Sequence, residues 1–291
     1  MSIKSHARKD VTKKLLSLCV GIALLSGTGG VLADAANQTV AGKLDGTAVT
    51  GNTTFNTVTV KSNTDAVVKN KDGQETTITN SSGGGWNLVA GAQDHKDKNT
   101  YEVMGGNVLN VSSNTDITIA KLTGGMSQMP GAPANSVRCY SVINNVVNIG
   151  CEEQHGGTLR AEAILGGESR IPSEQSADAY QKAYPVYNVI NLKGMTITGQ
   201  ETKPLTIAGG QVSGRQGSSY GNVINIQGDV VLKQAQIYGA DNSGMAERTV
   251  FGGHACGNRI NLSGQANLNK EVSCRGSIMQ GHMIVAVDVR I

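Results

Sequence analysis

The chain of 291 residues has few aromatic side chains: they make up 3% of it, with one Trp and two Phe. Charged residues are also scarce, at 16%, whereas glycine is abundant, with 38 copies. This composition does not suit a globule built on large rings, but it suits a narrow core stacked from Val and Ile. No long amphipathic helix separates the apolar segments, so the sequence predicts an all-β fold.

Outside the N-terminal segment, the chain has no excess of basic residues. The formal net charge of the chain is +3, from 25 Lys and Arg against 22 Asp and Glu. Residues 1–35 hold five of these basic and two of these acidic residues, which leaves 20 of each in the remainder. Binding to nucleic acid or to an anionic membrane surface depends on clustered Lys and Arg, so neither is expected.

Catalytic motifs are missing as well. We expect no nucleophile elbow of the Gly-x-Ser-x-Gly kind, no Cys/His pair with an orienting carboxylate and no phosphate-binding Gly loop. A polysaccharide-cleaving β-helix would need acidic and basic groups on one outer face, but here they are scattered over loops, which favours a solvated surface. They are Glu152, Glu153, Glu162, Glu168, Arg170, Asp241, Glu247 and Arg248. We therefore expect no enzyme, no cofactor and no metal centre.

A five-residue phrase organises the chain: Asn, a variable residue, an aliphatic residue, Asn and a second aliphatic residue. It occurs five times, with starts 38, 43, 34 and 36 residues apart, at 107–111, 145–149, 188–192, 222–226 and 258–262. Repetition at this spacing is typical of a repeat architecture. With a period of two residues, the third and fifth positions face inward and the second and fourth face outward.

A second phrase, an aliphatic segment followed by a Gly or Ala doublet, alternates with the first. It is found at 122–125, 164–167, 207–210 and 237–240, and residues 88–91 resemble it. The interval from an Asn phrase to the next doublet is 17 or 21 residues, whereas the interval from a doublet to the next Asn phrase runs from 13 to 22. This difference predicts a fixed structural arc followed by a loop of variable length.

Together the two phrases predict a right-handed parallel β-helix with an irregular N-terminal cap. Stacked Asn side chains can pass amide hydrogen bonds from coil to coil, and glycines supply positive φ or let neighbouring coils approach closely. The spacing fits either one coil of about 36 residues or two coils of about 18.

The N-terminal residues 1–33 predict a secretory signal peptide. A basic stretch precedes the apolar run from Leu15 to Leu25, which is too short to span a membrane. Small residues follow, with cleavage expected after Ala33 or Ala35. Cys19 does not indicate a lipoprotein, because Leu18 is too large for a lipobox and the apolar run continues past the cysteine.

Three further segments follow the signal peptide. Residues 34–100 are expected to form the N-terminal cap or first irregular coils, with strands at 55–60 and 75–79. Residues 101–262 are the repeat array, and residues 263–291 are an incomplete C-terminal repeat that ends in an apolar strand.

Two local features leave alternatives open. Residues 172–185 predict a short projecting helix, with Ser173 as N-cap and Pro185 as stop, and this segment is either a binding loop or a neutral insertion. Trp86 follows three glycines, and we favour a plug at the end of the core over a carbohydrate platform.

Four cysteines remain outside the signal peptide. In an exported chain they predict two disulfides, with three possible connectivities. Metal ligation by Cys151 with His155 and by Cys256 with His254 is the weaker alternative, because these spacings match no closed zinc motif. Free thiols are a third possibility. The candidate disulfide residues are Cys139, Cys151, Cys256 and Cys274.

The basic signal peptide, the Asn phrases and the apolar-Gly-Gly phrases together resemble the passenger region of autotransporters and related adhesin-like proteins of Gram-negative bacteria. The resemblance covers residues 1–33 and 88–262. It implies a β-helix displayed outside the cell and anchored by a C-terminal outer-membrane barrel, and it implies no site residue, because the repeats mark scaffold positions. The sequence lacks the alternating segments of a barrel. We therefore expect a truncated gene product, a released protein or export through a separate barrel.

The sequence therefore predicts an exported, non-catalytic adhesin at the cell surface or outside the cell. Its loops on a β-helical rod would contact host or bacterial cell surfaces, with glycans among the candidate ligands. Two alternatives remain open. An exported polysaccharide lyase or hydrolase would bring acidic and basic side chains together in one groove, and a structural surface or biofilm component would self-associate.

Overall fold

The computed structural model contains strands and no helix in the part of the chain that it describes. The chain divides into two units, Met1–Ala35 and Ala36–Ile291, and every described residue belongs to the second. The all-β prediction is confirmed for this part, and the predicted signal peptide lies outside it. The described residues are 54–79, 87–94, 101–112, 114–128, 137–150, 156–170, 180–200, 202–214, 217–245, 255–263, 267–268 and 273–275.

The strands form three sheets. The asparagine sheet, named after its Asn phrases, contains β1 (Thr57–Val60), β2 (Asp65–Lys69), β3 (Glu75–Thr79), β7 (Val108–Val111), β10 (Val146–Ile149), β13 (Val189–Lys193), β17 (Val223–Gln227) and β22 (Arg259–Ser263). The glycine sheet, which carries the doublets, contains β4 (Asn87–Val89), β5 (Ala92–Asp94), β8 (Ile117–Gln128), β11 (Thr158–Arg170), β14 (Thr196–Thr198), β15 (Leu205–Gly214), β18 (Val231–Lys233), β19 (Ala235–Tyr238), β20 (Asp241–Met245), β23 (Asn267–Leu268) and β24 (Ser273–Arg275). The third sheet contains β6 (Tyr101–Gly105), β9 (Val137–Ile143), β12 (Tyr180–Val186), β16 (Ser219–Tyr220) and β21 (Ala255–Cys256).

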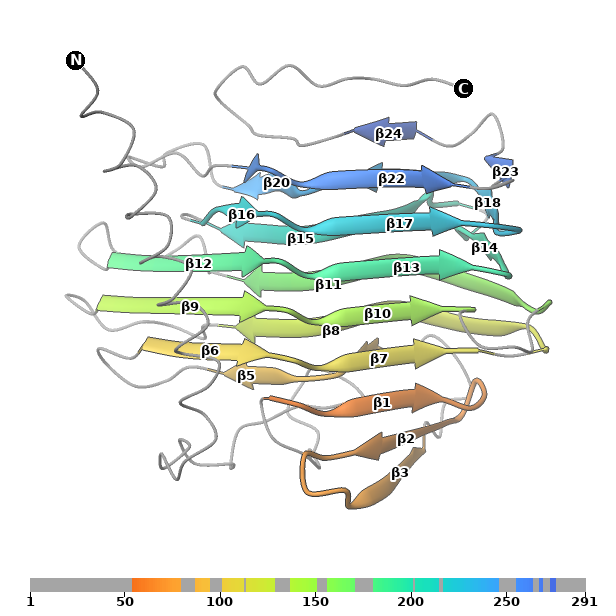
Figure 1. The fold of residues 1–291 in the computed structure, drawn as a ribbon, viewed down its shortest axis with the longest axis horizontal. Coiled ribbons are helices and arrows are strands. Elements are labelled where there is room, and N and C mark those ends of the chain that lie inside the picture. The colour runs from red at the N-terminus through yellow and green to blue at the C-terminus, as the bar shows by residue number, and fades with distance from the viewer. Residues whose placement is uncertain are drawn as a thin grey trace, which may run out of the picture. The chain divides into compact units, whose positions relative to one another are not determined.

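Each repeat crosses the three sheets in the same order. β7, β8 and β9 belong to one repeat, and β10, β11 and β12 belong to the next. Equivalent strands pair in parallel, with Asn110 opposite Asn148 and Asn148 opposite Asn191. In Figure 1 these strands lie one above another, and those of the glycine sheet run the opposite way behind the asparagine sheet. An Asn phrase therefore pairs directly with the Asn phrase of the next repeat and not with a Gly-doublet phrase.

The third and fifth positions of the Asn phrase enter one aliphatic core with residues of the glycine sheet. Leu109, Val147 and Ile190 are fully buried, as the two-residue period predicts. Each such side chain contributes about 1.5–3 kcal/mol relative to an exposed one. Leu262 is an exception, at 46% exposure, because β22 is the end strand among the described strands of its sheet. The buried apolar residues of the described part include no aromatic ring, in keeping with the composition.

The N-terminal end of the asparagine sheet breaks the parallel pattern. β1 pairs in parallel with β7 but antiparallel with β2, and β2 pairs antiparallel with β3. The strands predicted at 55–60 and 75–79 are confirmed as β1 and β3. Parallel stacking therefore stops at β1 among the described strands of this sheet.

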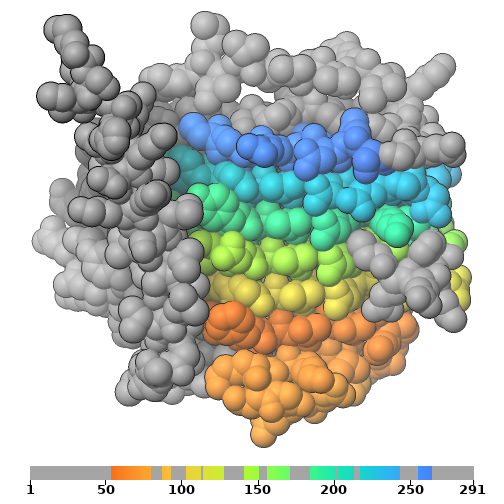
Figure 2. All heavy atoms as spheres, in the orientation of Figure 1, coloured from red at the N-terminus to blue at the C-terminus, as the bar shows by residue number. Residues whose placement is uncertain are grey.

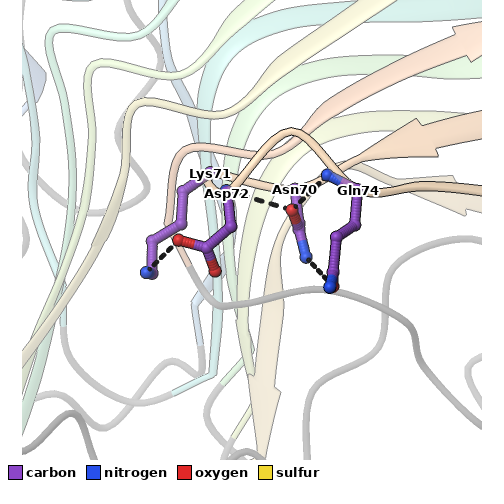
Figure 3. Close-up of polar contacts among 4 residues, drawn as sticks. All are labelled: Asn70, Lys71, Asp72 and Gln74. Carbon is purple, nitrogen blue, oxygen red and sulfur yellow. Dashed lines mark hydrogen bonds and ion pairs between the residues drawn. The ribbon is translucent and has the colours of Figure 1, made fainter.

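The turn between β2 and β3 is held by the side chain of Asn70 (Figure 3). Its Oδ1 accepts the backbone N–H groups of Asp72 and Gln74, at 3.0 and 2.9 Å. Its Nδ2 donates to Oε1 of Gln74 at 3.1 Å, and Gly73 supplies the positive φ of 81° that the turn needs. Asn bonded to its own backbone in this way is a common turn device, and here it sets the register of the hairpin.

The helix predicted over 172–185 is wrong where the structure describes this segment. Residues 180–186 form strand β12, which pairs in parallel with β9 along its whole length. This continuous ladder outweighs the local capping signals of Ser173 and Pro185, because propensity is a weak prior against tertiary pairing. Residues 171–179, which contain Ser173, lie outside the described residues.

Candidate functional site

The first Asn of each phrase lies where the third sheet meets the asparagine sheet, and its side chain is part of a ladder. Asn145 donates its backbone N–H and one Nδ2–H to Oδ1 of Asn188, at 3.1 and 2.9 Å. Asn188 donates the same pair to Oδ1 of Asn222, at 3.0 and 2.9 Å, and its other Nδ2–H goes to the carbonyl of Val142 at 2.9 Å. The Asn188 amide thus uses both donors and accepts twice, as a buried amide requires. This inner ladder comprises Asn56, Asn107, Asn145, Asn188, Asn222 and Asn258.

The Gly doublets exist because the glycine sheet passes close to the inner ladder. A Cβ on Gly167 would lie 2.5 Å from Nδ2 of Asn188. A Cβ on Gly166 would lie 2.5 Å from the carbonyl oxygen of Gly209 in the next strand. A side chain at either position would force its neighbours to shift, so close approach, one of the two predicted roles of glycine, is confirmed at Gly166 and Gly167. The other role, positive φ, applies to Gly106, whose φ is 68°.

The second Asn of each phrase faces outward and forms an outer ladder. Asn148 donates Nδ2–H to Oδ1 of Asn110 at 2.9 Å, and Asn191 donates to Asn148 at 2.8 Å. Asn225 and Asn261 continue the row, each at 2.8 Å. The predicted passage of amide hydrogen bonds between stacked Asn side chains is confirmed by both ladders. In space-filling view, the strands of the asparagine sheet from β1 to β22 form successive bands, and the hairpin of β2 and β3 lies beyond β1 (Figure 2).

The residue before each inner-ladder Asn forms a corner column with left-handed backbone. Its members are Phe55, Gly106, Asn144, Tyr187, Gly221 and Gly257, with φ between 55° and 68°. Phe55 and Tyr187 are about half exposed, at 51% and 52%. This column was not predicted from the sequence. The available signal was the residue before each Asn phrase: it is Gly at three of the six positions and Asn at one, and both residue types favour positive φ.

Two of the charged residues singled out in the sequence, Glu168 and Arg170, come together with Lys121, which sequence reasoning missed. Nζ of Lys121 lies 2.6 Å from Oε2 of Glu168, and Nε of Arg170 lies 2.7 Å from Oε1. Glu168 is only 2% exposed, on a strand that continues past its Gly doublet and pairs with Gln211. The expectation that these charges lie on solvated loops is therefore wrong for Glu168.

Two opposing effects act on the Glu168 carboxyl. Burial raises its pKa, but the Lys121 ammonium and the Arg170 guanidinium outweigh this effect, so the net pKa is below its ordinary value. Both carboxylate oxygens are engaged, and the group is shielded from solvent. Lys121 on β8 and Glu168 on the neighbouring strand β11 thus form an ion pair across two paired strands of the glycine sheet.

The remaining charged candidates are not part of this cluster. Asp241 is buried on β20 and accepts a hydrogen bond from Nε2 of Gln211 at 3.0 Å. Glu162 is partly exposed and lies 3.7 Å from Nζ of Lys203. Glu152, Glu153, Glu247 and Arg248 lie outside the described residues.

One segment matches a catalytic pattern by its letters, contrary to the expectation from the sequence. Residues 217–221 read Gly-Ser-Ser-Tyr-Gly, with Ser219 at the centre. A nucleophile elbow needs an exposed serine on a strand-to-helix turn. Ser219 is instead fully buried in β16, where its Oγ donates to Oδ1 of Asn242 at 3.0 Å.

The predicted disulfides stay predictions. Cys256 is exposed and carries a free thiol in the structure. Cys151 and the side chains of Cys139 and Cys274 lie outside the described residues, as do His155, His254 and Trp86. Within the described part of the chain, no three His, Cys, Asp or Glu side chains converge on a point where a metal ion could bind.

Comparison with known proteins identifies no relative: no family model, no curated protein and no solved structure matches the chain. No helix among the described residues is long and apolar enough to cross a membrane.

Proposed function

We propose that the chain is an exported adhesin-like passenger whose three sheets are the faces of a right-handed parallel β-helix, with one repeat per coil. In this proposal the stack is a scaffold without catalysis, and the protein acts by binding host or bacterial cell surfaces from the outer membrane or the medium. Residues 1–33 direct export.

One observation carries the proposal: six strands of the asparagine sheet, from β1 to β22, pair in parallel and in register, with an amide ladder on each side of the sheet. The inner ladder leaves the buried amides of Asn188 and Asn222 fully bonded, which favours a rigid column over an adaptable active site. A long, regular and rigid face suits binding through many weak contacts.

The polysaccharide-cleaving alternative receives no support from the described residues. Such an enzyme needs an acid or base that reaches its substrate. Glu168 is enclosed by two cations, and Asp241 is buried against Gln211. The structural-component alternative remains open, and self-association of the purified chain would favour it.

Binding of the fluorescently labelled full chain to cultured epithelial cells and to intact Gram-negative bacteria tests the proposal. We expect saturable binding that excess unlabelled protein displaces and heat-unfolded protein does not. No saturable binding to either cell type, at any protein concentration up to the solubility limit, would contradict it.

Export is tested separately by cell fractionation. A charge in the apolar run, Leu24→Arg, should keep the chain inside the cell, because a signal peptide needs an uninterrupted apolar segment. The neighbouring Ser26→Thr change is the matched control and should leave export intact. Equal export of both variants would remove the signal-peptide assignment.

A further inference from the structure

The corner column combines exposure with backbone strain at two aromatic residues. Phe55 and Tyr187 have φ of 59° and 55°, a region that costs a bulky residue about 1–2 kcal/mol relative to glycine. The equivalent positions Gly106, Gly221 and Gly257 carry glycine, so the fold itself does not need a side chain there. The fold demands positive φ at every position of this column, so a bulky side chain that the fold does not need there is a reason to look for a function.

The two rings rest on the glycines of the following repeat. A Cβ on Gly106 would lie 2.6 Å from Cδ1 and Cε1 of Phe55, and a Cβ on Gly221 would lie 2.5 Å from the same atoms of Tyr187. Each ring thus has one side supported by backbone and about half of the residue open to solvent. Two rings held in this way, three repeats apart, are separated by roughly 14 Å.

More aromatic side chains lie close to Tyr187. Its backbone N–H donates to the carbonyl of Tyr220 at 3.0 Å, and the rings of Tyr220 and Tyr184 stack with centroids 6.4 Å apart. Tyr184 and Tyr220 are themselves half-buried. Tyrosine rings with hydroxyl groups combine apolar faces with hydrogen-bonding tips.

The six parallel strands of the asparagine sheet, from β1 to β22, continue this surface with almost no charge. Its outward positions carry a column of Val or Thr beside the outer Asn ladder. Among the outward residues of the six parallel strands only Lys193 and Arg259 are charged. Lys193 is at the strand end opposite the corner column, and Arg259 is in the last strand. A charged ligand would therefore find few oppositely charged side chains across the centre of these six strands.

The size of this face limits its partner. Six strands spaced about 4.8 Å apart, each about 15 Å long, give a planar area of roughly 360 Å². A stable protein complex buries about 800 Å² on each partner. A thin linear polymer fits this face better than a second copy of the chain or another folded protein.

We infer that the corner column binds a single chain of a neutral polysaccharide, running across the repeats. The rings of Phe55 and Tyr187 pack against the apolar C–H faces of its sugar rings. The inference rests on the proposed function and names the class of ligand that it would recognise.

Sedimentation of the full chain with insoluble microcrystalline cellulose and with chitin tests the inference, and electrophoresis through gels with soluble polygalacturonate supplies an acidic comparison. The test variants are Phe55→Gly and Tyr187→Gly, which restore the residue found at the equivalent glycine positions and so preserve the fold. Tyr187→Phe keeps the ring. Tyr238→Ser, on the outward side of the glycine sheet, is the matched control for losing an aromatic residue. Circular dichroism and thermal unfolding verify folding of each variant.

We expect retention on cellulose or chitin that weakens about tenfold in each glycine variant, because each variant loses the contact of one aromatic ring. Tyr187→Phe and Tyr238→Ser should bind like the parent. Three results would overturn the inference: no retention on either neutral glycan, equal binding by the glycine variants, or binding to polygalacturonate alone.

Cell binding separates this inference from the proposed function. A double glycine variant that still binds cells like the parent overturns the glycan site and leaves the adhesin proposal standing. Loss of both cell and glycan binding in the double variant supports both proposals. A parent protein that binds neither cells nor glycans overturns both.

Discussion

Replacement of Asn188 by alanine tests the inner ladder most directly. The change removes four hydrogen bonds: two that Asn188 accepts from Asn145, and two that it donates, to Val142 and to Asn222. Asn145 is fully buried, so its backbone N–H and one Nδ2–H lose their partner where water does not reach. Each orphaned buried donor costs about 1–3 kcal/mol, which predicts a loss of roughly 2–6 kcal/mol in the free energy of unfolding.

The matched control is Asn148→Ala in the outer ladder. It removes the hydrogen bonds to Asn110 and Asn191, but the site is only partly buried and water can replace them. We expect a loss of about 1 kcal/mol or less. Because repeat proteins often unfold in parts, denaturant unfolding should be combined with amide hydrogen exchange in the asparagine sheet. If Asn188→Ala costs no more than Asn148→Ala, the inner ladder is not the stabilising element inferred here.

A double-mutant cycle sharpens the test. Gly167→Ala alone should destabilise by about 1–3 kcal/mol, because its Cβ meets the amide of Asn188. With alanine at 188 that space is empty, so the double variant should be more stable than the sum of the single effects predicts. Gly166→Ala is the control, because its Cβ meets the carbonyl oxygen of Gly209, which the change at 188 leaves in place. Additivity in both pairs would refute the close-approach explanation of the doublet.

Three further predictions concern charge and thiols. Lys121→Met leaves the buried Glu168 carboxylate with Arg170 alone and should cost about 3 kcal/mol in denaturant unfolding, whereas the exposed change Lys71→Met should cost little. The pKa of Glu168 is lowered by folding, so its stabilisation is present above the ordinary carboxyl value of 4.5 and is lost as the pH falls through the lower folded value. Glu168→Gln should therefore flatten the acid limb of a plot of unfolding midpoint against pH, and an unchanged limb would contradict the assignment. Maleimide should label the exposed Cys256 in the native protein without denaturant, whereas a disulfide-linked peptide mass containing Cys256 would favour the sequence-based pairing.

The repeat, the all-β class and the inward and outward positions of the Asn phrase could all be predicted from the sequence. These features follow from local chemistry. A strand whose aliphatic residues recur at every second position has one apolar face, whichever strand it pairs with. The in-register stacking of Asn110, Asn148 and Asn191 follows from the same repetition, since identical phrases align identical side chains.

Only the tertiary structure decided which residues meet across repeats. Lys121 and Glu168 are 47 positions apart in the sequence, and their pairing depends on the register between β8 and β11. The strand at residues 180–186 replaced a predicted helix because a parallel neighbour supplied hydrogen bonds that no local signal encodes. Phe55 and Tyr187, which are exposed and have strained backbone, belong to one column only because long-range strand pairing aligns the repeats. Neighbouring residues in the chain do not encode this alignment.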